Sequence, residues 1–325
     1  MRLHVFGGSL SFEDASRISG VEDVITSDEA ARVLRDLAKK HSVVHMLGDH
    51  PYLKYFDFVL NPADKKLRET LTRVFTTVRD CRKELSDLRA IKQPEEIAVM
   101  RQAVNLTVDG YKVIKEKLPK LKYEYEVEAE FDYLFRRRGA GQAYDPIVAG
   151  GVHACTMHYD ANRDTLKKRE LVMMDVGARV GGYAADISRT YAVGQPTKRQ
   201  IAVHAGVQAA HQEIIKLIAP NVSIREYHQR ADEIMIGTLI ELGLMSDSRD
   251  TQLYRTYFPH AISHGLGIDA HDSLGSSAYF QPGMVLTVEP GIYIPEEGIG
   301  VRIEDDILVT ATGRDNLSGK LSTDL

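Results

Sequence analysis

The sequence predicts an α+β fold in which a large domain of two similar halves follows a small α/β domain. Three observations lead to this prediction. Two helical segments followed by short apolar runs occur twice along the chain. Glycine-containing turns separate the apolar runs, which is typical of antiparallel hairpins. A helix start in the segment IKQPEEIAVM marks a boundary, so residues 1–87 are assigned to the small domain and residues 88–325 to the large one.

The composition is that of a globular protein without a strong charge bias. The 325 residues are 43% hydrophobic, which is enough for a large core, and their formal net charge is -5. This balance gives no electrostatic reason to expect nucleic acid or a membrane surface as a partner. No apolar run approaches the ~18 residues of a membrane span, and the N-terminus lacks the pattern of a signal peptide. Because Cys81 and Cys155 form no disulfide framework, we expect a cytoplasmic protein.

In the small domain, two short apolar runs and two amphipathic segments are expected to form an α/β unit. HVFGGSL and SVVHMLG have the apolar, β-branched character of strands. Between them, residues 27–40 place apolar side chains on one helical face, with acids first and lysines last. Residues 63–85 repeat apolar side chains every three or four positions, which predicts another amphipathic helix.

The first half of the large domain begins at Pro94, which suits the first turn of a helix because its missing N–H group costs nothing there. We expect a helix from this proline to about residue 118 and a second helix over residues 124–139, closed by Gly139. The segments PIVAGG, LVMMDVGARV and GYAADISRTYAV then read as strands.

The second half repeats this order. One helix starts at a Thr197 cap and stops before Pro220, and the next opens with the capping pair Ser223 and Glu226 and ends at Gly243. The segments MVLTVEPGIYI, GVRIED and ILVTA follow as strands.

Two aspartates in the first half are expected to lie on one face of a hairpin. Asp175 and Asp186 stand on strand-like runs joined by Gly181 and Gly182, a glycine pair typical of a two-residue turn. Their separation is odd, and across such a hairpin an odd separation puts two residues on the same face. The two carboxylates are therefore predicted to converge.

Two glutamates repeat the pattern in the second half. Glu289 and Glu304 are also an odd number of positions apart, around the turn signal of residues 295–298. An isolated carboxylate inside an apolar strand carries a large desolvation penalty. A salt bridge or exposure to solvent explains one such acid, but four at matched positions favour a pair of divalent cations as the compensating charge.

Three histidines within twelve residues accompany these acids. His260 and His264 have the spacing of a helical zinc motif, but Ala261 replaces the glutamate of that motif, and the neighbouring proline and glycines argue against a helix. An extended segment instead allows one imidazole to bind metal while the others, His271 among them, line the cleft. A packed or surface role remains the alternative for any single histidine.

At these positions the sequence resembles the pita-bread metallopeptidases, the family of methionine aminopeptidase, aminopeptidase P and prolidase. The matching stretches are IKQPEEIAVMRQA, IVAGGVHACTMHY, LVMMDVGARVGGYAADISRTY, PHAISHGLGIDAHDS, PGMVLTVEPGIYI and GIGVRIEDDILVT, in the order of the family. The resemblance implies a pita-bread catalytic domain with a curved antiparallel sheet and outer helices. By resemblance, Asp175 chelates one metal ion, and Asp186 and Glu304 bridge both ions. His264 and Glu289 hold the second ion.

Within this family, the pair His271-Asp272 and the string RIEDD resemble the proline-specific branch. Ser263 ahead of His264 resembles aminopeptidase P more than prolidase. The implied activity is that of an Xaa-Pro aminopeptidase, in which a hydroxide bridging two metal ions attacks the bond before proline. The mostly oxygen donor set and the resemblance both favour Mn²⁺, with Co²⁺ or Zn²⁺ as alternatives.

Further roles follow from this implied activity. Glu289 is the candidate to take a proton from the attacking water. His260 and His271 are expected to bind the tetrahedral intermediate or the peptide around the proline, and His158 the substrate beyond it. Arg302 is expected to orient Glu304, unless it forms a surface salt bridge. A nucleophilic pair of Cys155 and His158 is not favoured, because nothing there lowers the pKa of a thiol.

Three other functions remain open at this point. An Xaa-Pro dipeptidase would split only the dipeptide, a methionine aminopeptidase would not require proline, and a non-catalytic module would only hold a peptide in the cleft. The 87 residues ahead of the catalytic stretch make a shorter N-terminal domain than is usual in the family. Because that domain helps assemble oligomers in the family, we expect a homodimer without assigning its contacts.

Overall fold

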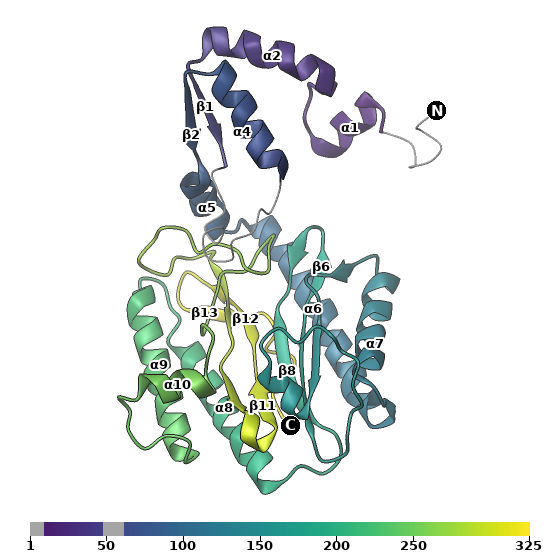
Figure 1. The fold of residues 1–325 in the computed structure, drawn as a ribbon, viewed down its shortest axis with the longest axis vertical. Coiled ribbons are helices and arrows are strands. Elements are labelled where there is room, and N and C mark those ends of the chain that lie inside the picture. The colour runs from purple at the N-terminus through teal and green to yellow at the C-terminus, as the bar shows by residue number, and fades with distance from the viewer. Residues whose placement is uncertain (1–9, 48–61) are drawn as a thin grey trace. The chain divides into compact units, whose positions relative to one another are not determined.

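The computed structural model describes residues 10–47 and 62–325, and the chain divides into two compact units, Met1–Leu85 and Ser86–Leu325 (Figure 1). Most of the strand predicted in HVFGGSL lies outside the described residues. Among the helices that are described, none has both the length and the apolar character needed to cross a membrane.

The smaller unit holds two parallel strands with helices around them. Its described elements are α1 (Phe12–Ser19), α2 (Ser27–Lys40), β1 (Val43–Met46), α4 (Pro62–Val74) and β2 (Thr77–Asp80). Helix α2 has the predicted bounds, and its N-cap Thr26 forms a capping box with Glu29. A small apolar cluster of Met46, Leu71 and Phe75 holds this unit together.

The single helix predicted over residues 63–85 is wrong beyond Val74. Helix α4 ends at that residue, β2 follows, and α5 (Arg82–Ala90) begins afterwards. The physical reason is tertiary pairing, because Thr77 and Val78 lie in parallel register with Val43 and Val44 of β1. Adjacent β-branched residues suit such a strand better than a helix, and a helical period alone does not reveal this.

The first half of the larger unit packs two helices against antiparallel strands. Helix α6 begins at Pro94 as predicted, and α7 ends before Gly139, whose φ is 71°. The strands pair in the orders β4-β5-β8 and β3-β6-β7. The elements are α6 (Pro94–Lys117), η1 (Leu118–Lys120), α7 (Glu124–Arg137), β3 (Gly141–Gln142), β4 (Ile147–Gly150), η2 (Gly151–Cys155), β5 (Leu171–Val176), β6 (Ala178–Val180), β7 (Tyr183–Ala184) and β8 (Ile187–Ala192).

The second half has the same plan. Thr197 and Ser223 cap its two long helices as predicted, since each side chain accepts a backbone N–H of the first turn. The strands pair in the orders β13-β12-β9 and β10-β11. The elements are α8 (Lys198–Lys216), α9 (Ile224–Glu241), α10 (Thr251–Tyr257), β9 (Val285–Val288), β10 (Gly291–Ile294), η3 (Pro295–Glu297), β11 (Ile299–Arg302), β12 (Asp305–Val309) and β13 (Arg314–Asn316). The sequence pattern does not predict α10 and β13, which are short and rich in polar residues.

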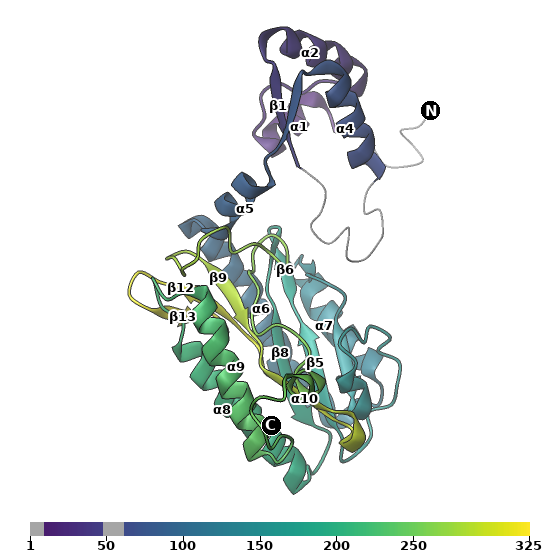
Figure 2. The same cartoon turned by 60° about the vertical axis from the view of Figure 1, so that its left-hand side comes forward.

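Each half of the larger unit has its own apolar core between helices and strands. The first core gathers side chains such as Met100, Tyr111 and Phe131, and the second gathers Val207, Met235 and Ile292, all fully buried. Helices α8 and α9 run side by side along the strands of the second half (Figure 2). The predicted domain of two similar halves is confirmed, and the polar residues described next lie where the halves meet.

Candidate metal centre

The first hairpin places Asp175 and Asp186 on one face. Asp175 lies opposite Ser188 in the β5–β8 ladder, and the β6–β7 ladder continues in the same register up to Val180 and Tyr183. Gly181 and Gly182 form the turn, with φ of 55° and 89°. The predicted two-residue hairpin is therefore confirmed, and Asp186 is diagonal to Asp175 across it.

The second ribbon places Glu289 and Glu304 directly opposite each other. Val288 pairs with Asp305 on one side of them, and Gly291 pairs with Arg302 on the other. Because the two ladders have the same register, Glu289 falls opposite Glu304 in the short gap between them. The turn of residues 295–298 closes the ribbon, as the sequence predicts.

The histidine segment is extended and runs beside β9. Main-chain and side-chain hydrogen bonds join His264 to Thr287, at 2.9 and 3.1 Å. Nδ1 of His264 donates to the carbonyl of Gly265 over 3.0 Å, which leaves Nε2 without a proton and free to bind a cation. Burial lowers the pKa of His264 to about 4, so this imidazole is neutral at pH 7.

These elements bring ligand atoms from both halves together. Asp186, His264 and Glu304 each offer one such atom, and the three atoms lie within 4.8 Å of one another. Nε2 of His264 is also 3.5 Å from Oε1 of Glu289. The hydroxyl of Tyr144 lies 2.6 Å from both Asp175 Oδ1 and Asp186 Oδ1. The structure thus links all five residues that the resemblance identifies as ligands.

The electrostatics of this cluster fit bound cations. Burial, followed by repulsion from Asp175 and Asp306, raises the pKa of Asp186 well above its usual range. Burial, Asp186 and Glu289 do the same to the pKa of Glu304, and burial raises the pKa of Glu289 to about 8. When ionised, these acids would carry more negative charge than the surrounding described residues neutralise, so they hold protons in the absence of cations. Oxygen donors with one free imidazole nitrogen are a suitable set for hard divalent cations.

Arg302 lies among these acids and is buried, which excludes the alternative of a surface salt bridge. Its Nη2 donates to Asp175 Oδ2, its Nε to Ser188 Oγ at 2.9 Å, and its Nη1 to the hydroxyl of Tyr293 at 3.0 Å. Ser188 Oγ in turn donates to Glu304 Oε2 over 2.6 Å. Arg302 therefore contacts Asp175 directly and reaches Glu304 only through Ser188.

The structure places the other predicted site histidines at different depths. Nδ1 of His260 lies 3.4 Å from Glu289 Oε2. Its Nε2 accepts a hydrogen bond from the Tyr293 hydroxyl over 2.8 Å. Burial lowers the pKa of His260 to about 3. The exposed His271 packs edge-on against His264, with ring centroids 4.4 Å apart. His158 is exposed after η2, and no hydrogen bond or ion pair of the described residues joins it to the cluster.

Three hydroxyl groups belong to the site although the sequence analysis does not single them out. Tyr293 is four positions after Glu289. Because side chains alternate along a strand, this even separation could have predicted that the two residues share a face. Tyr144 comes from the irregular stretch between β3 and β4, where no periodicity points to the cluster. Ser188 becomes important only because it meets Glu304 of the other half.

The comparisons with known proteins agree with this geometry. The model of metallopeptidase family M24 matches residues 98–311. The chain belongs to this family. The predicted family, hydrolase class and pita-bread fold are thereby confirmed.

Relatives and solved structures within the family carry specific names. The chain is 35% identical to the Xaa-Pro aminopeptidase of Escherichia coli K12, over 97% of this chain and 76% of that protein. It is 32% identical to the Xaa-Pro aminopeptidase of Haemophilus influenzae, over 98% of this chain and 76% of the relative. The structure of proline aminopeptidase P II from Yersinia pestis matches with a TM-score of 0.84 and 36% identity, over 99% of this chain and 79% of that one.

Proposed function

We propose that this M24 metallopeptidase is an Xaa-Pro aminopeptidase that holds two divalent cations, Mn²⁺ in the first instance. The proposed ligands are those implied by the resemblance: Asp175, Asp186, His264, Glu289 and Glu304. One observation carries the proposal, the convergence of acids from two ribbons on an imidazole whose Nε2 is unprotonated. The names of the relatives support the specificity for Xaa-Pro peptides.

The side chains of this centre have separate tasks in the proposed reaction. When bound, divalent cations supply a strong nucleophile at neutral pH by acidifying water. The ionised carboxylate of Glu289 takes the proton of the attacking water and passes it to the leaving nitrogen of proline. Arg302 fixes Asp175, and its hydrogen bond with Tyr293 extends to His260.

The histidines are proposed to handle the peptide. His260 is neutral, and its Nδ1 donates to the carbonyl of Ala261, so the ring is fixed beside Glu289. We assign His260 and His271 to the intermediate or to the peptide around the proline. His158 is assigned to the residues beyond the proline, because its exposed position leaves it available to a longer peptide.

Peptide length separates the proposed activity from its alternatives. With Mn²⁺ present, peptides Xaa-Pro-Yaa of increasing length are expected to lose their first residue, and matched peptides with alanine in place of proline are expected to remain intact. Turnover of the dipeptide Xaa-Pro alone would identify a dipeptidase instead. Release of methionine without a following proline would identify a methionine aminopeptidase.

Metal analysis tests the number and kind of ions directly. The protein purified with Mn²⁺ is expected to hold two ions per chain, and Asp186→Asn is expected to lose them together with activity. Asp186→Asn that loses its ions yet keeps every partner interaction and its cellular role would support the non-catalytic alternative. Co²⁺ and Zn²⁺ are compared in the same assay.

The proposal extends to the organisation of the protein. We assign catalysis to residues 88–325, supported by the compact unit Ser86–Leu325 that contains every proposed ligand. We also propose a cytoplasmic homodimer, and the two cysteines, which are both free thiols, agree with a reducing compartment. Sedimentation at several protein concentrations tests the dimer.

A further inference from the structure

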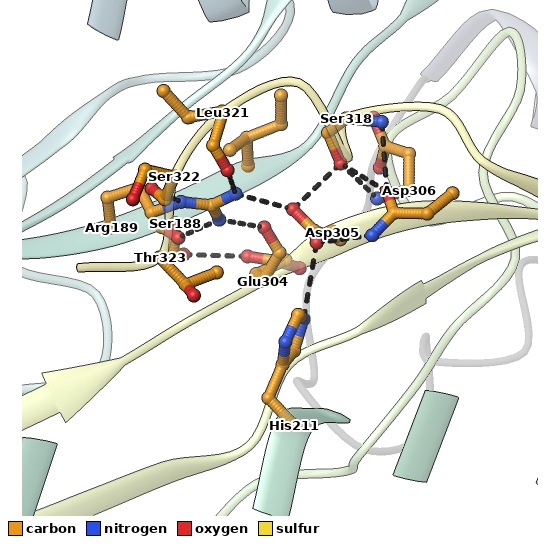
Figure 3. Close-up of polar contacts among 12 residues, drawn as sticks. Ser188, Arg189, His211, Glu304, Asp305, Asp306, Ser318, Leu321, Ser322 and Thr323 are labelled. Carbon is orange, nitrogen blue, oxygen red and sulfur yellow. Dashed lines mark hydrogen bonds and ion pairs between the residues drawn. The ribbon is translucent and has the colours of Figure 1, made fainter. Parts of the chain in front are cut away.

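Arg189 uses its whole hydrogen-bonding capacity in the interior of the protein. It lies on β8 and is 1% exposed. Nη1 donates to the carbonyls of Ser188 and Glu304 at 2.9 and 2.8 Å. Nη2 donates to Asp305 Oδ1 at 2.7 Å and to the carbonyl of Leu321 at 3.1 Å, while Nε donates to the carbonyl of Ser322 at 3.1 Å (Figure 3). Because a guanidinium has five N–H donors, none is left over.

Two of these five acceptors belong to the place where the halves meet. The sheet β4-β5-β8 and the sheet β13-β12-β9 are separate ladders, so the alignment of β8 with β12 depends on contacts outside either ladder. The main-chain N–H of Glu304 donates to the carbonyl of Ser188 over 3.0 Å, and Nη1 of Arg189 binds the carbonyls of both residues. Arg189 thus fixes the spacing of the two main chains at Ser188, two residues after Asp186, and at Glu304 itself.

The remaining acceptors hold the guanidinium in this position. Asp305 neutralises its charge and is itself held by Ser318 Oγ at 2.8 Å and Asn316 Nδ2 at 2.6 Å. The carbonyls of Leu321 and Ser322 come from the segment after β13, and both meet the guanidinium of Arg189 (Figure 3). That segment has a further attachment, because Gln208 Nε2 of α8 donates to Thr323 Oγ1 over 2.8 Å. Displacement of any of these segments would leave an N–H group of this buried guanidinium without its acceptor, which is costly.

We propose that Arg189 is a positioning residue of the metal centre, which presents Glu304 to Asp186 by binding the main chain of both strands and the carbonyls of Leu321 and Ser322. The inference rests on the proposed function, because Asp186 and Glu304 are ligands only if that function holds. A lysine at this position keeps the charge but offers three donors on a flexible stem, so it cannot bridge the same five acceptors.

The experiment measures Mn²⁺ binding to metal-stripped protein by calorimetry, for wild type and Arg189→Lys. Arg189→Lys is expected to bind Mn²⁺ about 10–100-fold more weakly, the range found for residues that orient ligands. At saturating Mn²⁺, kcat for an Xaa-Pro peptide is expected to fall while KM stays within about twofold, because Arg189 does not touch the peptide. Thermal unfolding of the metal-free proteins measures the purely structural part of the change.

Arg314→Lys is the matched control. Arg314 also binds two carbonyls, those of Lys216 and Ile218, at 2.9 and 3.2 Å, but it touches none of the proposed ligands. Its lysine variant is expected to lose some thermal stability and to bind Mn²⁺ like wild type. The inference would be overturned if Arg189→Lys unfolded at a lower temperature than wild type but bound Mn²⁺ as tightly as Arg314→Lys.

A second variant covers the case in which Arg189→Lys does not fold. Asp305→Asn keeps the oxygen that accepts from Nη2 but removes the charge that holds the guanidinium, so a several-fold weaker Mn²⁺ affinity is expected. Unchanged affinity in Asp305→Asn would overturn the inference as well. If the wild-type protein binds no Mn²⁺, the proposed function fails and the inference fails with it. If wild type binds Mn²⁺ and both variants match it, only the inference fails.

Discussion

The two halves of the larger unit supply their acids in different ways. The first half uses aspartates on a hairpin with a two-residue turn, where Asp175 and Asp186 are diagonal neighbours. The second half uses glutamates that face each other between two ladders, behind a longer turn. Tyr144 contacts both aspartates from within their own half, whereas Glu304 receives its hydroxyl partner, Ser188, from the other half.

This difference shows that neither half makes a complete site. Arg302 of the second half binds Asp175 of the first, and Asp306 accepts the main-chain N–H of Asp186 over 3.1 Å. In return, Ser188 of the first half donates a hydrogen bond to Glu304 of the second. Each half therefore depends on hydrogen bonds from the other half to hold its carboxylates in place.

The largest expected effect comes from removing one acid of either half. Asp186→Asn and Glu304→Gln are each expected to lower kcat/KM by about 10³-fold or more, because each removes a proposed bridging ligand. The double variant is expected to be scarcely worse than either single one, as for groups that act as a unit. A fully additive double variant would show that the two halves work independently.

The pH dependence of Mn²⁺ binding is the next largest effect. Burial raises the pKa of Glu289 to about 8, so its carboxyl is protonated at pH 6 and must release that proton to bind a cation. The affinity is expected to rise by about tenfold or more per pH unit between pH 6 and pH 8. His264 does not compete in this range, because burial lowers its pKa to about 4.

The same pKa shift has a defined sign for folding. A carboxyl with a raised pKa favours the folded metal-free protein below the ordinary value of 4.5, and this contribution is lost as the pH rises through about 8. Calorimetric titrations with Mn²⁺ at several pH values measure the pH dependence of binding. In the control Glu289→Gln, the slope of the logarithm of the affinity against pH is expected to be smaller by one proton. An affinity independent of pH in the wild type would contradict the assignment.

Removing single hydroxyl groups distinguishes support within a half from support across the boundary. Tyr144→Phe and Ser188→Ala are each expected to weaken Mn²⁺ binding by about tenfold. Tyr191→Phe is a suitable control, because the buried Tyr191 hydroxyl has no hydrogen-bond partner among the described residues. A larger loss of Mn²⁺ affinity in Ser188→Ala than in Tyr144→Phe would show that contacts between the halves contribute more to the metal centre than contacts within one half.

The smallest expected effect concerns the turn of the first hairpin. Gly182 has a φ of 89°, which side chains rarely adopt, and open space surrounds the position of a Cβ atom. Gly182→Ala is therefore expected to lower the free energy of unfolding by about 1 kcal/mol through backbone strain alone. Mn²⁺ affinity is expected to stay unchanged in the same preparation, and a marked loss would mean that this turn also sets the position of Asp186.

The sequence predicts the geometry within each ribbon and misses what depends on packing between ribbons. The odd separations place Asp175 with Asp186 and Glu289 with Glu304, because alternation along a strand is a local property. The pairing of Ser188 with Glu304 follows only from the docking of two sheets. The same limitation explains the error at Thr77 and Val78, whose strand forms because β1 lies beside it.

The carbonyl groups that saturate Arg189 have a consequence for the timing of synthesis. Leu321 and Ser322 come after Glu304 in the chain, so a ribosome delivers all five proposed ligands before it delivers these two acceptors. Until then the chain lacks two of the five acceptors that Arg189 binds in the folded protein. The proposed metal centre is thus expected to be completed only late in translation.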